Sequence, residues 1–280
     1  MRRRRAAGER SAAAKDSRDI LCVIGCMKDE ARHITEWIDH YFWQGAAHLV
    51  VIDNGSTDET ARLVEEHPRR RDITLFRWPR PFHQIGHVRR AVTEARLLER
   101  FQWLVAADGD EFWFAKSGAP LSQVLSEFER IDLVYCNWTL FGSAADGAPP
   151  ASLRTELTRC QPALGSHDFT KWAVRTDALS QPAMLSIHKV NGIESGRTVS
   201  DTHLLQLNHY FTQSRAYWRD VKMARGSAVD PAHSVLRTWE MFEDFERDCT
   251  AFDDRLARLV LASAGADLRT GEGTKPRRTG

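Results

Sequence analysis

The sequence lacks the features of a membrane-spanning or secreted protein. None of its apolar runs approaches the roughly 18 residues that a transmembrane helix needs. The arginines near its start are followed by Ala, Glu and Lys, where a signal peptide would have an apolar core. Its five cysteines are an odd number and stand mostly in apolar runs, which favours buried thiols over disulfides. We therefore expect a cytoplasmic protein, with peripheral membrane association as the alternative.

Net charge is also nearly absent, at +1 for the whole chain. Residues 1–19 carry +4 and residues 263–280 carry +2, so the rest of the chain holds about −5. A negative body lacks the basic footprint of a nucleic-acid-binding protein, and we expect no nucleic-acid partner. Both ends have little to bury and are predicted to be disordered, the first as a basic tail. Residues 20–262 are long and apolar enough to form a single domain.

Short apolar runs alternate with helix-like segments up to residue 110. This alternation predicts an α/β fold of βαβ units, with a mostly parallel central sheet flanked by helices. The expected strands are 20–26, 48–52, 73–76 and 103–107, and the expected helices are 34–42, 59–66 and 85–100. Pro, Gly and Ser become frequent from 141 to 166, which predicts long loops. The later strands are expected at 132–137, 169–174 and 204–207, and the later helices at 121–128, 214–223 and within 240–261.

Acidic side chains follow three of these expected strands: Glu30, Asp53 and the segment from Asp108 to Glu111. Because parallel neighbouring strands bring their carboxyl ends to one edge of a sheet, we expect these groups to share a crevice. Asp108 and Asp110 can both turn toward one hard cation, and oxygen ligands favour Mg²⁺ or Mn²⁺. The alternative interpretation is an ordinary acidic turn. The first strand is not followed by Gly-x-Gly-x-x-Gly, which disfavours a dinucleotide-binding dehydrogenase.

Five short motifs follow one another between residues 20 and 226. They are Lys28-Asp29-Glu30 with Glu36-Trp37, Asp53 to Asp58, Asp108 to Phe112, Phe141-Gly142-Ser143, and Asn208-His209-Tyr210 with Ser214, Lys222 and Gly226. In this order they resemble the glycosyltransferases of family 2 and family 92, in the GT-A superfamily. The resemblance implies a Rossmann-like GT-A fold, with a nucleotide-sugar-binding half at 20–115 and a loop-rich acceptor-side half at 116–262. Two positions depart from the family pattern: Asp29, where Asn is usual, and Gln213, where family 92 often has Lys.

The resemblance implies transfer of a sugar from a nucleotide-sugar donor, with a UDP-sugar as first choice, to a hydroxyl of a glycan or lipid-linked acceptor. It also implies inversion at the anomeric carbon. In such an enzyme the Asp53 motif would bind the nucleoside, and Asp108 and Asp110 would hold a metal on the diphosphate. Glu111 would either support these metal ligands from behind or face the sugar. The expected nucleotide-sugar contacts are Glu30, Asp53, Asn54, Ser56, Asp58, Asp108, Lys171 and Lys222.

Sugar transfer also requires groups that meet the negative charge left on the departing nucleoside diphosphate. Lys171 and Lys222 are the candidate cationic side chains, although surface lysines are the ordinary alternative. His209 is our first choice for a third metal ligand beside the two aspartates, ahead of His188 and His203.

An inverting transfer further needs a carboxylate that accepts the proton of the acceptor hydroxyl. We prefer Asp168, which stands just before an expected strand, to Glu194 and Asp201. Trp113 and Trp172 are the preferred aromatic platforms for a sugar, with Trp138 and Trp218 as further candidates. Loops carry specificity in many enzymes, so the acceptor is expected near residues 144–165.

Three other functions fit parts of the same pattern. A phosphohydrolase would use Asp108 as its nucleophile, but its motif usually continues with Thr or Val where Phe112 stands. A metal-dependent nucleotidyltransferase would share the metal and the nucleotide but release pyrophosphate instead of a nucleoside diphosphate. The non-enzymatic alternative is a nucleotide- or sugar-binding module, which the intact Asp53, Asp108 and Asp110 disfavour.

Overall fold

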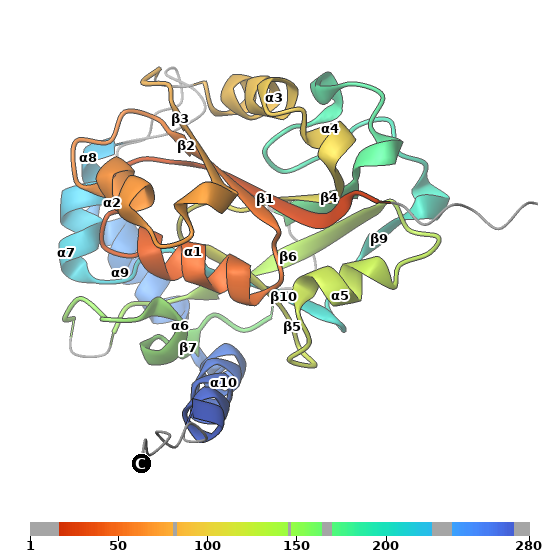
Figure 1. The fold of residues 1–280 in the computed structure, drawn as a ribbon. Helices are drawn as coiled ribbons and strands as arrows, with labels where there is room; N and C mark the ends of the chain where they lie inside the picture. Colours follow the sequence, from red (N-terminus) through yellow and green to blue (C-terminus); the bar gives the residue numbers. More distant parts are fainter. Residues whose placement is uncertain (1–16, 81–82, 145–146, 164–169, 226–236, 272–280) are drawn as a thin grey trace, which may run out of the picture.

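A twisted sheet runs through the molecule and carries helices on both faces (Figure 1). The computed structural model describes residues 17–80, 83–144, 147–163, 170–225 and 237–271. The predicted α/β architecture is confirmed. In these ranges no helix has both the length and the apolar character to cross a membrane.

The centre of the sheet consists of four parallel strands in the order β4-β1-β2-β3. They are β1 (Asp19–Met27), β2 (His48–Asp53), β3 (Ile73–Arg77) and β4 (Phe101–Ala106). Cys26 lies opposite Ile52 of β2, and Ile24 lies opposite Ala106 of β4. The register therefore ends these strands at one edge, as the sequence predicts.

Beyond β4 the sheet becomes mixed. The antiparallel strand β8 (Thr170–Arg175) joins β4 to β6 (Leu133–Phe141). The strand β10 (Leu205–Tyr210) runs parallel to β6 and antiparallel to β5 (Glu111–Ala115). The strand β5 is absent from our sequence-based prediction, which assigned no strand between residue 107 and the helix expected at 121–128. Three shorter strands complete the sheet: β7 (Arg159–Cys160), β9 (Thr198–Ser200) and β11 (Ala251–Phe252).

Each side of the sheet has its own apolar cluster, because successive residues of a strand point to opposite faces. Leu21 and Val23 of β1 share one cluster with the helices α1, α2 and α5, whereas Cys22 and Ile24 share the other with α3 and α4. These helices are α1 (Ile34–Trp43), α2 (Thr60–Glu66), α3 (Gln84–Glu94), α4 (Leu97–Arg100) and α5 (Leu121–Ser126).

The helix predicted at 85–100 is interrupted. Arg96 has a left-handed backbone (φ 52°), which separates α3 from α4. The helix predicted at 214–223 is also irregular, because the π-helical turn Trp218–Lys222 lies between α7 (Arg215–Tyr217) and α8 (Met223–Arg225). The other helices are α6 (Leu153–Glu156), α9 (Trp239–Asp248), α10 (Arg255–Gly271) and the 3₁₀ turns Arg70–Asp72, Thr176–Ala178, Pro182–Met184 and Ser195–Arg197.

The chain ends are described in part. Arg18 donates hydrogen bonds to Thr176 and Asp177, and Asp19 begins β1, so these two residues belong to the folded body. The helix α10 continues to Gly271, past residue 262 where we expected the domain to end. The remainder of both predicted tails lies outside the described residues.

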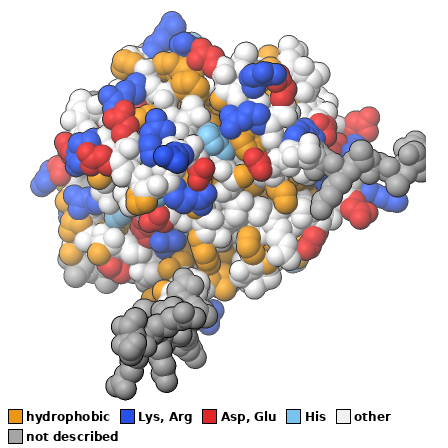
Figure 2. All heavy atoms as spheres, viewed as in Figure 1, with side chains coloured by type: hydrophobic (Ala, Val, Ile, Leu, Met, Phe, Trp, Pro, Cys, Tyr) orange, Lys and Arg blue, Asp and Glu red, His pale blue; other side chains and the backbone are white. Residues whose placement is uncertain are grey.

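The near-zero net charge and the five cysteines of the sequence can be followed in the structure. Figure 2 shows basic and acidic side chains interspersed over one face of the molecule. All five cysteines are free thiols, and four are buried, whereas Cys26 is half-buried.

We predict that Gly25→Ala destabilises the fold by about 1–3 kcal/mol, the usual cost of overpacking a core. A Cβ atom at Gly25 would lie 2.5 Å from the backbone oxygen of Ala107 and 2.8 Å from Met27 Cε. Gly196→Ala is the matched control, since no heavy atom of the described residues lies within 4 Å of its added Cβ. Denaturant unfolding of both variants measures the difference, and equal stabilities would contradict this account.

Candidate active site

The candidate site lies where β1, β2 and β4 end. The segment after β1 and the segment after β4 touch, because a Cβ atom at Gly109 would lie 2.9 Å from Glu30 Cγ. Glycine is therefore required between the two aspartates by the close approach of Glu30. Tyr217 of α7 also reaches this point, and its hydroxyl donates to the Glu30 carboxylate at 3.3 Å.

The loops after β1 and β2 are joined by their side chains. The Asp29 backbone N–H donates to Ser56 Oγ at 2.9 Å, and the Thr57 N–H donates to Asp29 Oδ1 at 2.7 Å. The Ala31 N–H donates to Asp58 Oδ2 at 3.0 Å. Asp29 has a left-handed backbone (φ 54°), a conformation that Asn and Asp adopt more readily than other side chains. Asp at this position is therefore compatible with the conformation of the loop.

Four predicted nucleotide contacts take part in these loop bonds. Asp53 Oδ1 accepts from the Ser56 N–H at 2.9 Å, and Asn54 Oδ1 accepts from the Arg80 N–H at 3.2 Å. Asp58 Oδ1 accepts from the Thr60 N–H at 3.0 Å. Asp58 thus binds the first turn of α2.

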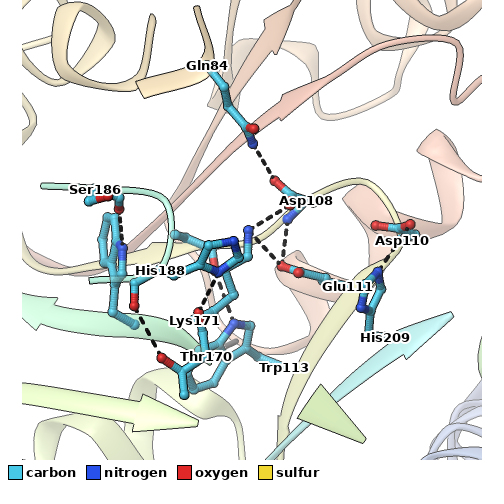
Figure 3. Close-up of polar contacts among 12 residues, drawn as sticks. Gln84, Asp108, Asp110, Glu111, Trp113, Thr170, Lys171, Ser186, His188 and His209 are labelled. Carbon is cyan, nitrogen blue, oxygen red and sulfur yellow. Dashed lines mark hydrogen bonds and ion pairs between the residues drawn. The ribbon is translucent and has the colours of Figure 1, made fainter. Parts of the chain in front are cut away.

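Asp108 is turned toward the α3 and β8 side of the crevice (Figure 3). Lys171 Nζ donates to its Oδ2 at 2.6 Å, and Gln84 Nε2 donates to its Oδ1 at 2.9 Å. Its backbone is fixed as well, because Trp37 Nε1 donates to the Asp108 carbonyl oxygen at 2.9 Å. Burial lowers the pKa of Lys171, but Asp108 and Glu111 outweigh burial and raise it above its ordinary value.

Asp110 is turned toward β10 and the π-helical turn. Lys222 Nζ donates to Asp110 Oδ2 at 2.5 Å, and His209 Nε2 lies 3.4 Å from the same oxygen. The Tyr210 N–H donates to the Asp110 carbonyl oxygen at 2.9 Å, which brings β10 alongside. Burial lowers the pKa of His209, although Asp110 opposes this shift.

Glu111 is fully buried next to these two aspartates. Its Oε2 accepts from the Asp108 N–H at 2.9 Å and lies 3.5 Å from Lys171 Nζ. Among the described residues its Oε1 has no hydrogen-bond partner. Burial, reinforced by the charges of Asp108 and Asp110 and opposed by Lys171, raises the pKa of Glu111 to about 8.

The three predicted metal ligands are only partly brought together. Asp110 and His209 converge, whereas both carboxylate oxygens of Asp108 bind Gln84 and Lys171. Over the described ranges, no group of three or more His, Cys, Asp and Glu side chains could hold a metal ion. Magnesium-type sites commonly use one or two protein carboxylates and complete their shell with substrate phosphates and water. Asp110 and His209 fit such an open site.

A pocket of about 330 Å³, its open mouth included, adjoins Asp108 and Lys171. Its size lies near the lower end of ligand pockets, and an apolar lining with a few polar groups is typical of them. The apolar lining includes Ile24, Ile85, Val88, Ala106, Trp172 and Leu185, and the polar lining includes Gln84, Asp108, Lys171 and Ser186.

Several candidate residues have other roles. Asp168 lies outside the described residues. The Asp201 carboxylate accepts from the backbone N–H groups of His203, Leu204 and Leu205, and Glu194 is exposed. Trp113, Trp172 and Trp218 are fully buried and donate to the carbonyl oxygens of Ala106, Ser186 and Thr238. Trp138 is half-buried, and its ring centroid lies 4.4 Å from that of His209 and 5.5 Å from that of His188.

Some side chains in the crevice were not predicted as contacts. Gln84 begins α3, and no pattern in one sequence distinguishes it from an ordinary first-turn residue. Phe211 directly follows the Asn208 to Tyr210 motif, and Tyr217 is three residues after Ser214. Their closeness to these motif residues could have indicated them.

Gln213, the other departure from the family pattern, has a left-handed backbone (φ 51°) and no exposed surface. Within the part of the chain that the structure describes, neither its side-chain oxygen nor its nitrogen has a hydrogen-bond partner. Such a residue stores backbone strain and the free energy of an unpaired amide.

Comparison with known proteins identifies the family. The fold and the crevice are those of an α/β protein with its candidate site at the carboxyl edge of a parallel sheet. A model of glycosyltransferase family 92 matches residues 20–249. The chain therefore belongs to glycosyltransferase family 92.

Two curated relatives carry the same family name. A family 92 protein of Oryza sativa subsp. japonica is 24% identical over 205 residues, which cover 71% of this chain and 34% of the relative. A family 92 protein of Ricinus communis is 23% identical over 230 residues, which cover 80% of this chain and 36% of the relative. The chain thus spans about a third of the length of these relatives.

Solved structures are more distant. Residues 1–349 of S. aureus TarS share 14% identity and a TM-score of 0.39, over 68% of this chain and 60% of that one. A glucosyl-3-phosphoglycerate synthase from Mycobacterium tuberculosis shares 20% identity and a TM-score of 0.31, over 58% of each chain. The fold is therefore established by the strand order of this chain and by the family match.

We predict that Glu111→Gln removes a pH dependence of stability. Because the pKa of Glu111 is raised from 4.5 to about 8, the folded chain keeps a proton that the unfolded chain has lost between these values. Wild-type stability should therefore fall relative to the variant as pH rises from 4.5 to 8, by up to about 1.4 kcal/mol per pH unit.

Parallel denaturant titrations of the two proteins across this range measure the difference. Glu129→Gln, at an exposed glutamate, is the control and should show no such trend. A constant difference between wild type and Glu111→Gln would mean that Glu111 is ionised in the folded protein.

Proposed function

We propose that this chain transfers a sugar from a nucleotide-sugar donor to a hydroxyl of a glycan or lipid-linked acceptor. The family 92 match carries the proposal, because it covers residues 20–249 and so includes the whole crevice. The convergence of Glu30, Asp108, Asp110 and two buried lysines at one edge of a parallel sheet supports it.

The donor would bind mainly to residues 20–115, together with Lys171 and Lys222 from the other half of the chain. The pocket beside Asp108 and Lys171 would bind part of the donor. Asp53, in the loop after β2, would contact the nucleoside. Lys171 and Lys222 are placed to meet the negative charge that grows on the departing nucleoside diphosphate. The order of these contacts along the crevice would be nucleoside, diphosphate and sugar.

We propose that the reaction depends on Mn²⁺ or Mg²⁺ held by Asp110 and His209. When bound, the ion would act as a Lewis acid on the diphosphate. Asp108, the other predicted metal ligand, is held by Gln84 and Lys171 and would bind the donor from that side. Two donors from the protein leave several positions for phosphate oxygens and water.

Glu111 and Asp168 would have different roles in the reaction. Glu111 is buried, and its raised pKa keeps it mostly protonated at neutral pH. It would therefore position the Asp108 backbone and Lys171 instead of accepting a proton. We keep Asp168 as the base that accepts the proton of the acceptor hydroxyl in an inverting transfer.

The acceptor would approach residues 116–262. Trp138, half-buried between His188 and His209, offers an apolar ring face next to His209, the histidine that faces Asp110. A lipid-linked acceptor would require peripheral association with a membrane, whereas a free glycan would be compatible with a cytoplasmic enzyme.

We predict that the full chain releases UDP from a UDP-sugar when Mn²⁺ and an acceptor are present. Asp110→Asn should reduce this rate by about 100-fold or more, the usual cost of losing an electrostatic contact to the reacting groups. Asp244→Asn is the matched control, because Asp244 is exposed and pairs only with Arg247 among the ion pairs of the described chain.

The measurement is a panel of UDP- and GDP-sugars with product analysis. Pyrophosphate as the product would favour nucleotidyl transfer, and binding without turnover would favour a binding module. Full activity of Asp110→Asn would remove Asp110 from the mechanism.

A further inference from the structure

The ammonium group of Lys222 is enclosed by acidic and aromatic groups beside the crevice. Its Nζ lies 2.5 Å from Asp110 Oδ2, 5.0 Å from the centre of the Phe211 ring and 5.5 Å from that of the Tyr217 ring. The side chain is 4% exposed. A buried cation needs such partners in place of water, and aromatic faces attract an ammonium group. The fold therefore contains a specific cation position next to Asp110.

The same carboxylate oxygen faces the imidazole of His209. His209 Nε2 lies 3.4 Å from Asp110 Oδ2, so the two side chains offer an oxygen and a nitrogen donor to one position. A divalent ion that binds Asp110 Oδ2 must compete with Lys222 Nζ for that oxygen. Lys222 is also the last residue of the π-helical turn Trp218–Lys222. Such turns are frequent at functional sites.

We propose that Lys222 is a built-in counter-ion, which holds the place of a divalent cation at Asp110 and moves to the donor diphosphate when that cation binds. The inference rests on the proposed function. As long as Lys222 neutralises Asp110, the pair offers no net charge to a diphosphate. Once a divalent ion has taken over Asp110, the ammonium group is released to the phosphate oxygens. The step is an exchange of ion pairs, and no covalent bond changes.

The exchange couples the two ligands. The cation releases Lys222 for the diphosphate, and the diphosphate draws Lys222 away from Asp110. Each ligand therefore strengthens the binding of the other by the same factor, which is typically about 5- to 150-fold. Lys171 is not part of this exchange, because its ammonium binds Asp108 and Glu111 instead of Asp110.

The test measures Mn²⁺ binding to the full chain from the electron paramagnetic resonance signal of the free ion, with and without saturating UDP. Wild type should bind Mn²⁺ at least about fivefold more tightly with UDP. Lys222→Met keeps the length of the side chain but removes the charge. Without UDP it should bind Mn²⁺ at least about fivefold more tightly than wild type, and UDP should then add less.

Lys171→Met is the matched control for loss of one positive charge in the same cluster, and its gain in Mn²⁺ affinity should be clearly smaller. Equal Mn²⁺ affinities of wild type and Lys222→Met without UDP would overturn the proposal, as would equal gains in the two variants. If Lys222→Met fails to fold, wild type alone decides, because UDP that binds without changing Mn²⁺ affinity overturns the exchange.

A failure of the proposed function gives a different result. UDP binding is followed separately by its thermal shift, since a ligand at 100 times its dissociation constant stabilises by about 2.7 kcal/mol. If neither UDP nor another nucleoside diphosphate binds, the proposed function is wrong. The comparison of Mn²⁺ binding by the variants without nucleotide still tests the competition between Mn²⁺ and Lys222 for Asp110.

Discussion

The candidate site depends on the pairing of two buried lysines with the carboxylates of Asp108 and Asp110. Asp110, Lys171 and Lys222 are buried, whereas Asp108 is half-buried. An ion removed from water costs several kcal/mol unless an opposite charge and hydrogen bonds replace the lost hydration. Each lysine comes from an element distant in sequence, so a correct charge balance exists only when β4, β8 and the helical segment after β10 are assembled together. The folded state and the chemical site are therefore specified by the same contacts.

Strand pairing places these charges within hydrogen-bonding distance. Val105 of β4 lies opposite Ala173 of β8, so the antiparallel register brings Lys171 level with the start of the Asp108 segment. His209 of β10 lies opposite Glu111 of β5 and thus beside Asp110. Helix α1 also fixes this segment, because Trp37 donates to the Asp108 carbonyl oxygen and Tyr41 donates to that of Glu111. The positions of the ionisable groups follow from backbone register more than from side-chain flexibility.

The sequence predicted the parallel strands and their acidic ends because both signals are local: an apolar run, then carboxylates. It did not predict β5, because Glu111 to Ala115 became a strand only through pairing with β10, about 95 residues later. For the same reason the sequence could not show that Asp108 and Asp110 turn to different lysines. Helical spacing predicted one helix at 85–100, whereas the left-handed Arg96 divides it. Loop partners such as Ser56 with Asp29 were hidden because both are common turn residues.

The two halves of the chain are also joined outside the crevice, by Glu36 of α1. Its carboxylate accepts from Ser152 Oγ at 2.6 Å, from the Leu153 N–H at 2.9 Å and from Arg154 Nε at 3.0 Å. Burial raises the pKa of Glu36, but these bonds and the charge of Arg154, together with His33, outweigh burial and bring it to about 2. A carboxylate held this firmly ties the start of α6 to the same helix that fixes the Asp108 segment. Glu36 therefore connects α1, in the proposed donor half, to the start of α6, in the proposed acceptor half.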